Sequence, residues 1–257
     1  RPEMAQLKER MRAELAPPAR NLWPDQALAT VRQARYDLSL DQERMAALRR
    51  LGLRPTAQKR ALLGVRPEPW EPAPADWGLD PGSPTASLPA GLLIPAHEGA
   101  VITRLLIRPG EITDPSADVE VPGSQPTTFA AGLAPGKPVV LVRDPLEAWL
   151  VEQDAGDFAG TAALADAGQA PDKATAAILK DAPRLLVTVY ARDAAGMQEE
   201  FAPWKKAWPQ AEPLPLPEKS AIFDAREKGV DLEEWVVEAL GPGQPAFVSE
   251  DSPFRAK

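Results

Sequence analysis

The sequence of 257 residues has a net charge of −8 and a 44% share of hydrophobic residues, which together predict a folded soluble protein of one or two domains. It contains no cysteine, which excludes disulfide bonds and zinc sites built from thiolates. No apolar run approaches the ~20 residues of a membrane helix, so we expect a cytoplasmic protein with no membrane partner.

The charge is distributed unevenly along the chain. Residues 1–70 carry 14 Lys and Arg against 8 Asp and Glu, whereas the remainder carries 15 against 29. A basic segment on an acidic protein is typical of a localised surface for nucleic acid. The charge count alone leaves an alternative open, in which arginine-rich helices simply have solvated faces.

The first 65 residues are predicted to form a helical, basic region. Apolar residues at helical spacing predict helices over residues 3–16, 26–36, 41–51 and 55–63. Asp25 is a candidate N-cap of the second helix, and Ser39 or Asp41 is a candidate N-cap of the third. Gly52 is expected to end the third helix.

Residues 66–136 are predicted to form a proline-rich connection and then a small antiparallel sheet. The connection, up to residue 90, holds Trp70 and Trp77, which we interpret as anchors that hold this loop against the core. Two apolar runs on either side of a short turn predict a β-hairpin over residues 91–108. If its second strand is regular, Arg104 and Arg108 share one face.

Residues 137–240 are predicted to form an α/β domain with a central parallel sheet, followed by a tail at 241–257. The β-branched runs at 138–142 and 184–190 are typical of buried strands, and a predicted helix follows each. Open α/β sheets bind ligands at the carboxyl ends of their strands. In this sequence those ends carry four charged residues: Arg143, Asp144, Glu147 and Asp193.

The same region resembles the toprim domain of bacterial and phage DNA primases. In that family the first strand ends in Glu-Gly-x-x-Asp-Ala and the later strand ends in Asp-x-Asp-x-Ala-Gly. This sequence has Arg143-Asp144-Pro145-Leu146-Glu147-Ala148 and Ala191-Arg192-Asp193-Ala194-Ala195-Gly196 at those places. The hairpin at 91–108 and Val119-Glu120-Val121-Pro122-Gly123-Ser124 resemble the strands that precede the domain, so the resemblance covers roughly residues 48–240.

The resemblance implies a fold, a reaction and a set of roles. In the family the first-strand Glu is a general acid and base, and the Asp pair holds Mg²⁺. Here Arg143 stands at the Glu position and Ala191 at the first Asp position, while Asp193 remains and Glu147 replaces the Asp of the first helix. We therefore expect no metal site and no cofactor, unless Asp144, Glu147 and Asp193 form a rearranged acidic set that binds Mg²⁺.

The resemblance also implies where nucleic acid is bound. Basic residues of the family's hairpin face template and primer, and Arg108 occupies the matching place, with Arg104 on the same predicted face. Arg143 is expected either to pair with Asp193 or to grip a phosphate. These three arginines are the candidate nucleic-acid contacts.

Three interpretations of the function stay open. The first is a primase-like toprim protein of a phage, plasmid or integrated mobile element, with a degenerate site, that binds DNA or RNA weakly or binds a replication partner such as a helicase. The second is an active DNA primase or nucleotidyl transferase that uses the rearranged acidic set. The third is a protein-interaction or regulatory module without a nucleic-acid role.

Overall fold

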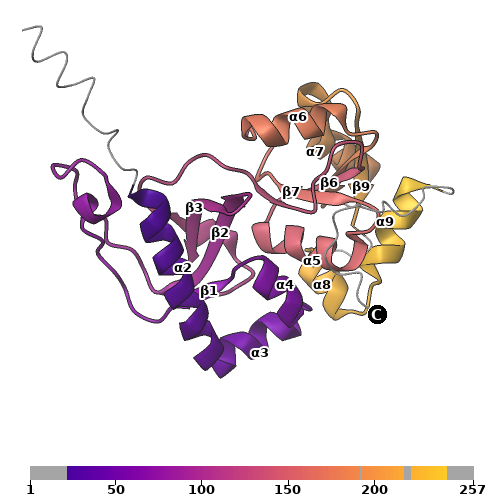
Figure 1. Ribbon diagram of the computed structural model, residues 1–257. Coiled ribbons are helices and arrows are strands. Elements are labelled where there is room, and N and C mark those ends of the chain that lie inside the picture. The colour runs from indigo at the N-terminus through magenta and orange to yellow at the C-terminus, as the bar shows by residue number, and fades with distance from the viewer. Residues whose placement is uncertain (1–21, 192, 217–220, 242–257) are drawn as a thin grey trace, which may run out of the picture.

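The computed structural model describes residues 22–191, 193–216 and 221–241, which form two sheets flanked by helices (Figure 1). The predicted helix at residues 3–16 and the tail from residue 242 lie outside the described residues. Among the residues that are described, no helix combines the length and apolar character needed to cross a membrane.

Helices open the described part of the chain, as predicted: α2 (Trp23–Leu40), α3 (Gln42–Arg50) and α4 (Pro55–Arg60). The prediction of Asp41 as a cap is confirmed, since its side chain accepts a hydrogen bond from the Arg44 N–H. The prediction of Asp25 as a cap is wrong, because the helix begins three residues earlier than predicted, at Trp23, and Leu22 occupies the N-cap position. Proline is tolerated in a first helical turn, so Pro24 does not prevent this earlier start.

The first sheet is antiparallel and contains the predicted hairpin. Its strands lie in the order β1 (Gly64–Arg66), β2 (Gly91–Glu98), β3 (Val101–Arg108) and β4 (Val119–Glu120). Helix α2 packs on one face, where Val31 shares a core cluster with Leu93 and Ile107.

The connection before the hairpin contains the 3-10 turn η1 (Pro74–Trp77), and a second such turn, η2 (Pro115–Ala117), precedes β4. Trp77 is buried, with its ring centroid 5.7 Å from that of Trp23 and 5.5 Å from that of Trp70. The two tryptophans of the connection therefore act as anchors, as predicted.

The second sheet has five strands in the order β5 (Phe129–Ala131), β7 (Gly160–Ala163), β6 (Val139–Val142), β8 (Leu185–Val189) and β9 (Ala211–Pro215). The runs at 138–142 and 184–190 are parallel strands of one sheet, as predicted, and β6 pairs directly with β8. Residues 129–131 were expected in the antiparallel sheet, and this expectation is wrong. They form an antiparallel edge of the second sheet instead, where Phe129 and Ala131 are buried in the core that α5 covers.

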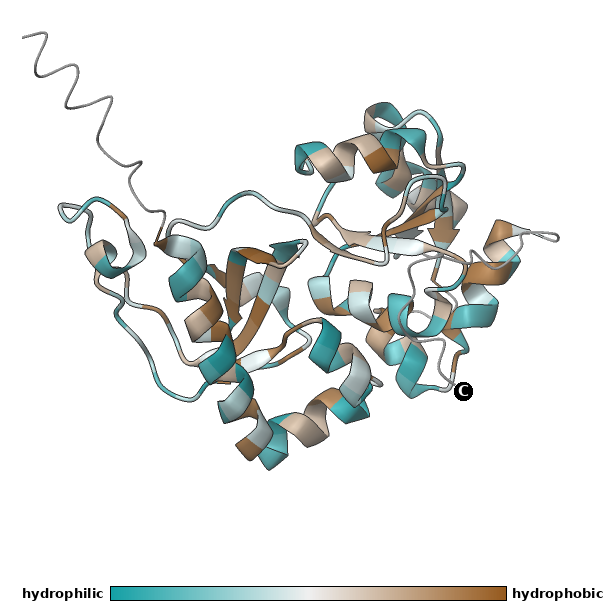
Figure 2. Ribbon diagram, in the orientation of Figure 1, coloured by the Kyte–Doolittle hydropathy of each residue, from teal (hydrophilic) through white to brown (hydrophobic). Residues whose placement is uncertain are grey.

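Helices cover both faces of the second sheet: α5 (Pro145–Ala155), α6 (Lys173–Asp181), α7 (Ala194–Ala207), α8 (Ile222–Glu227) and α9 (Leu232–Leu240). Alternation along each strand sends Val140 and Leu186 into the core with α5, α8 and α9, whereas Val139 and Leu185 pack toward α6 and α7. Figure 2 shows brown strands in both sheets and teal stretches along α2, α3 and α4.

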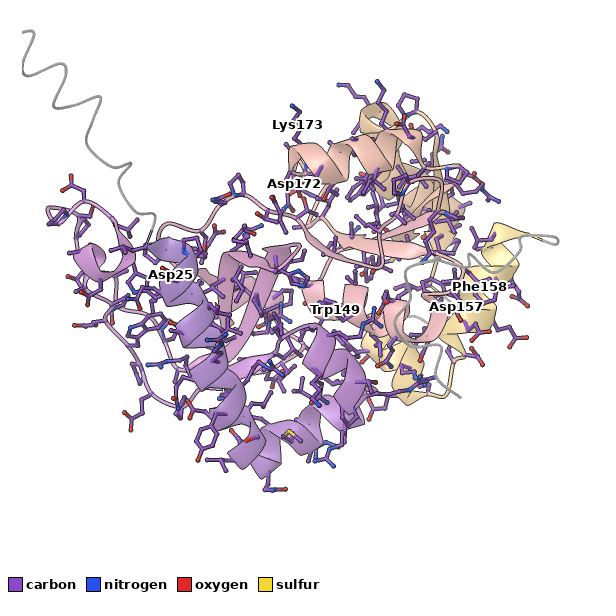
Figure 3. All side chains as sticks on the ribbon, viewed as in Figure 1. Asp25, Trp149, Asp157, Phe158, Asp172 and Lys173 are labelled. Carbon is purple, nitrogen blue, oxygen red and sulfur yellow. The ribbon has the colours of Figure 1, made fainter. Side chains whose placement is uncertain are left out.

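One hydrophobic cluster joins the two sheets. It includes Leu92 and Ile94 of β2 together with Leu146 and Leu150 of α5. Trp149 of α5 lies at this joint (Figure 3), and the Arg60 guanidinium lies 5.7 Å from its ring centroid. The face of the first sheet that α2 leaves uncovered is therefore buried against the α/β part.

Candidate site at the strand ends

The fold brings the four predicted residues to one edge of the second sheet. Strand β6 ends at Val142 and the parallel strand β8 ends at Val189, so the segments that follow them lie at the same edge. Arg143, Asp144 and Glu147 follow the first strand, and Asp193 follows the second. This is the edge at which open α/β sheets hold their ligands.

The Asp144 carboxylate is occupied by contacts within the protein. One oxygen accepts a hydrogen bond of 2.6 Å from the Leu146 N–H and so caps α5, and the other lies 2.8 Å from a guanidinium nitrogen of Arg108. The side chain is 6% exposed, and this burial raises the pKa of Asp144, while the charge of Arg108 opposes the shift. Asp144 therefore serves as a helix cap and as one half of a buried ion pair.

Arg108 lies at the centre of a buried charge cluster. Its side chain has no exposed surface, two of its nitrogens donate to Asp118 at 2.7 Å each, and a third donates to the Ile112 carbonyl at 2.8 Å. Burial alone lowers the pKa of Arg108, but the hydrogen bond to Asp118 and the charge of Asp144 outweigh it and raise the pKa. A phosphate would have to displace one of these carboxylates to reach the guanidinium.

Arg104 and Arg108 do share one face of β3, because their pairing with β2 runs without interruption from Ala96 to Leu92. Leu106, which lies between them on that face, belongs to the core that joins the two sheets. The Arg104 guanidinium donates to Glu120 at 2.7 Å and to the Thr127 carbonyl at 3.1 Å. The face that carries both arginines therefore points into the joint, where each arginine already has a carboxylate partner.

Arg143 pairs with Glu200 of α7, and not with Asp193 as one alternative had it. Its guanidinium lies 4.4 Å from the centroid of the Tyr190 ring. Glu200 also accepts hydrogen bonds from the backbone N–H groups of Tyr190 and Ala191, at 2.9 and 2.7 Å. One carboxylate thus fixes both the arginine after β6 and the backbone after β8.

Glu147 is buried in the first turn of α5. Its two oxygens accept hydrogen bonds from the Tyr190 hydroxyl at 2.9 Å and from the Ile222 N–H at 3.0 Å. Burial, with a smaller contribution from the charge of Asp144, raises the pKa of Glu147 to about 7. Burial raises the pKa of Tyr190 as well, and the neighbouring Glu147 adds to that shift. Glu147 therefore links α5, the end of β8 and the start of α8.

Asp193 is exposed and caps α7, since its carboxylate accepts a hydrogen bond of 2.8 Å from the Gly196 N–H. Ala191, at the other acidic position of the family motif, has only a methyl group. The sequence predicts that Asp193 follows the later of the two strands. It does not predict that the Asp193 and Glu147 side chains both stabilise the starts of helices.

These residues do not fit a magnesium site. Mg²⁺ requires near-octahedral oxygen ligands, whereas the oxygens of Asp144 and Glu147 receive internal hydrogen bonds or an ion pair, and Arg143 is a permanent cation. Within the described residues, no three Asp, Glu or His side chains gather in a way that could hold a metal ion.

The partners of the three arginines, namely Asp118, Glu120 and Glu200, were not singled out in the sequence. Asp118 and Glu120 lie on or beside the short strand β4, and Glu200 lies in the second turn of α7. Spacing along the chain gives no signal for these pairs, because Arg143 and Glu200 are 57 residues apart. The acidic balance after residue 70 predicts only that carboxylates are abundant near the site.

No family model and no curated protein matches the sequence. Among solved structures, the RNA polymerase domain of the Mycobacterium tuberculosis primase DnaG matches with a TM-score of 0.59 and 16% identity, over 86% of this chain and 83% of that chain. A DNA primase domain from Pseudomonas aeruginosa matches with a TM-score of 0.57 and 16% identity, over 82% and 76%. A DnaG primase catalytic domain bound to single-stranded DNA matches with a TM-score of 0.53 and 14% identity, over 87% and 86%.

The similarity covers most of this chain and most of each matched chain, while the sequence identity stays low. It agrees with the toprim resemblance of the two strand-end motifs and of the hairpin. Over most of its length, this chain has the fold of the DnaG primase catalytic core.

Proposed function

We propose that this chain is a primase-like protein that binds nucleic acid and does not synthesise primers. The observation that carries the proposal is the set of internal contacts at the strand ends, where Asp144, Glu147 and Asp193 each accept hydrogen bonds within the fold. Arg143, at the position of the family's general acid and base, cannot accept a proton. The rearranged acidic set has no free pair of carboxylates for a metal ion.

The nucleic-acid part of the proposal is supported by the fold and by charge. Two of the matching primase structures are described as bound to single-stranded and to double-stranded DNA. The first 70 residues of this chain are basic, although the whole chain is acidic. Arg104, Arg108 and Arg143 stay candidate contacts, but each would exchange a carboxylate for a phosphate. Origin in a phage, plasmid or integrated element and partnership with a helicase stay predictions.

Two measurements on the purified protein test this proposal together. Fluorescence anisotropy with a labelled single strand should show salt-sensitive binding with little base preference. Incubation with template, Mg²⁺ and nucleotides should yield no oligomers above background. Primers that disappear in Asp193→Ala would support the active enzyme instead, and a lack of binding at low salt would support the protein-interaction module.

A further inference from the structure

A groove opens between α2, α3 and α4, on the basic side of the molecule. It has a volume of about 520 Å³ and takes Arg32, Arg35 and Tyr36 from α2 and Lys59 from α4. None of the described residues that line it is acidic. It is therefore a concave surface with three cations and no opposing carboxylate on its walls.

The cations of this groove differ from the arginines of the strand-end site. Arg104, Arg108 and Arg143 each pair with a carboxylate, as described above. Within the described part of the chain, the side chains of Arg32, Arg35 and Lys59 form no hydrogen bond and no ion pair with another residue. A phosphate could bind them without displacing an internal partner.

The groove also presents an aromatic ring. Tyr36 is 60% exposed, and it lies toward the C-terminal end of α2, whose opposite face is buried. Arg32, Arg35 and Tyr36 stand at positions i, i+3 and i+4, so they share one face of α2. Leu38 and Met45 supply apolar surface beside them.

We propose that this groove binds a single strand of nucleic acid, with phosphates at Arg32, Arg35 and Lys59 and a base stacked on Tyr36. The inference rests on the proposed function and deepens it, because it places the contact with nucleic acid in this groove and not at the strand ends. Cations beside an exposed aromatic ring are the combination that single-strand binding surfaces use. An acidic polypeptide would satisfy the cations, but it would leave the ring without a stacking partner.

The test is the anisotropy of a labelled oligothymidylate at several salt concentrations, with three variants. Replacing Arg32, Arg35 and Lys59 together by Gln should lower the slope of log affinity against log salt by about 2, since each single-strand phosphate contact contributes about 0.7. Tyr36→Ala should weaken binding about tenfold, whereas Tyr36→Phe, which keeps the ring, should bind like the original chain. Among the described residues, none of these four side chains forms a hydrogen bond or an ion pair, so the variants should fold.

A matched control replaces Lys173, Lys180 and Lys206 by Gln. These three cations are exposed and lie on α6 and α7, away from the groove, and the change in net charge is the same. The control should keep the original salt slope. As a measurement that needs no variant, photocrosslinking of an iodouridine-labelled strand to the full chain should place the crosslink at Tyr36.

The outcomes separate the inference from the proposed function. If the original chain binds no single strand at low salt, the proposed function fails and the inference fails with it. If it binds, but the groove variant behaves like the original chain, or the lysine control loses as much slope, only the inference is overturned. If a polyglutamate peptide binds the groove as tightly as the oligothymidylate, and Tyr36→Ala changes neither, the groove is a site for acidic polypeptides.

Discussion

At the scale of single residues, the charged side chains at the strand ends stabilise the fold by pairing with one another. Arg108 is fully buried between Asp118 and Asp144, and all three charges are compensated only as a set. Removing one member of a buried ion pair typically costs about 3–5 kcal/mol, because it leaves an uncompensated charge. Arg108→Ala should therefore lower the free energy of unfolding by about that amount in urea denaturation.

Arg104→Ala is the matched control for this prediction. Its partner Glu120 has a 42% exposed side chain, so loss of the pair should cost about 1 kcal/mol or less. If Arg108→Ala keeps its stability and loses affinity for nucleic acid, the arginine contacts phosphate as the resemblance first implied, and the buried cluster does not hold it in solution.

Glu147 gives the fold a pH dependence whose sign follows from its pKa. The Glu147 carboxyl has a pKa of about 7 in the folded protein, above its ordinary value of about 4.5. At a pH between these two values, the folded state therefore holds a proton that the unfolded state has lost. Stability should therefore fall as the pH rises from about 4.5 to 7, by an amount on the order of 3 kcal/mol, and then level off. Denaturation across this range measures the slope.

The neutral variant Glu147→Gln should remove most of that slope, since it keeps an amide oxygen near Tyr190 and Ile222 but cannot titrate. Asp144, whose pKa burial also raises, is expected to contribute a slope of the same sign. A variant whose stability has the same pH profile as the original chain would show that another group titrates.

At the scale of elements, the N-cap of α6 joins a helix to an edge strand. Asp172 (labelled in Figure 3) accepts hydrogen bonds from the N–H groups of Thr175 at 2.9 Å and Thr128 at 3.0 Å, just before β5. Burial opposes its ionisation, but these hydrogen bonds outweigh that effect and lower the pKa of Asp172. Asp172→Ala should cost about 1–2 kcal/mol.

Hydrogen exchange can localise this loss. We expect Asp172→Ala to speed exchange in the first turn of α6 and at Phe129–Ala131, while β6 and β8 keep their protection. Faster exchange throughout the second sheet would mean that the cap stabilises the whole unit and not this corner.

The elements also show how far the sequence predicts the structure. Local patterns suffice for the helix that Asp41 caps, for the hairpin and for the two central strands, because propensity, burial and capping act over a few residues. The sequence predicts no separate strand β5 and only includes its residues in the region of the antiparallel sheet, since the pairing of Phe129 with Ala163 depends on a residue 34 positions away. The carboxylate partners of the three arginines could not be predicted for the same reason, because each arginine and its partner meet only in the folded chain.

At the scale of the whole molecule, one hydrophobic cluster runs through both sheets, from Leu48 and Leu92 to Leu186 and Val236. The predicted boundaries at residues 65/66 and 136/137 stay predictions, but the shared core favours one cooperative unit. Far-ultraviolet circular dichroism and tryptophan fluorescence should report coincident unfolding transitions. Two separated transitions would mean that the helical and α/β parts unfold independently.

We propose that the carboxylates at the strand ends serve the fold and leave no site for a catalytic metal. The most direct test of this central claim is a calorimetric titration of the full chain with Mg²⁺, alongside Asp193→Asn as the comparison. We expect no saturable binding in the millimolar range and identical traces for the two proteins. A saturable isotherm that Asp193→Asn abolishes would contradict it, and would show that Asp193, with Asp144 or Glu147, forms a working acidic set.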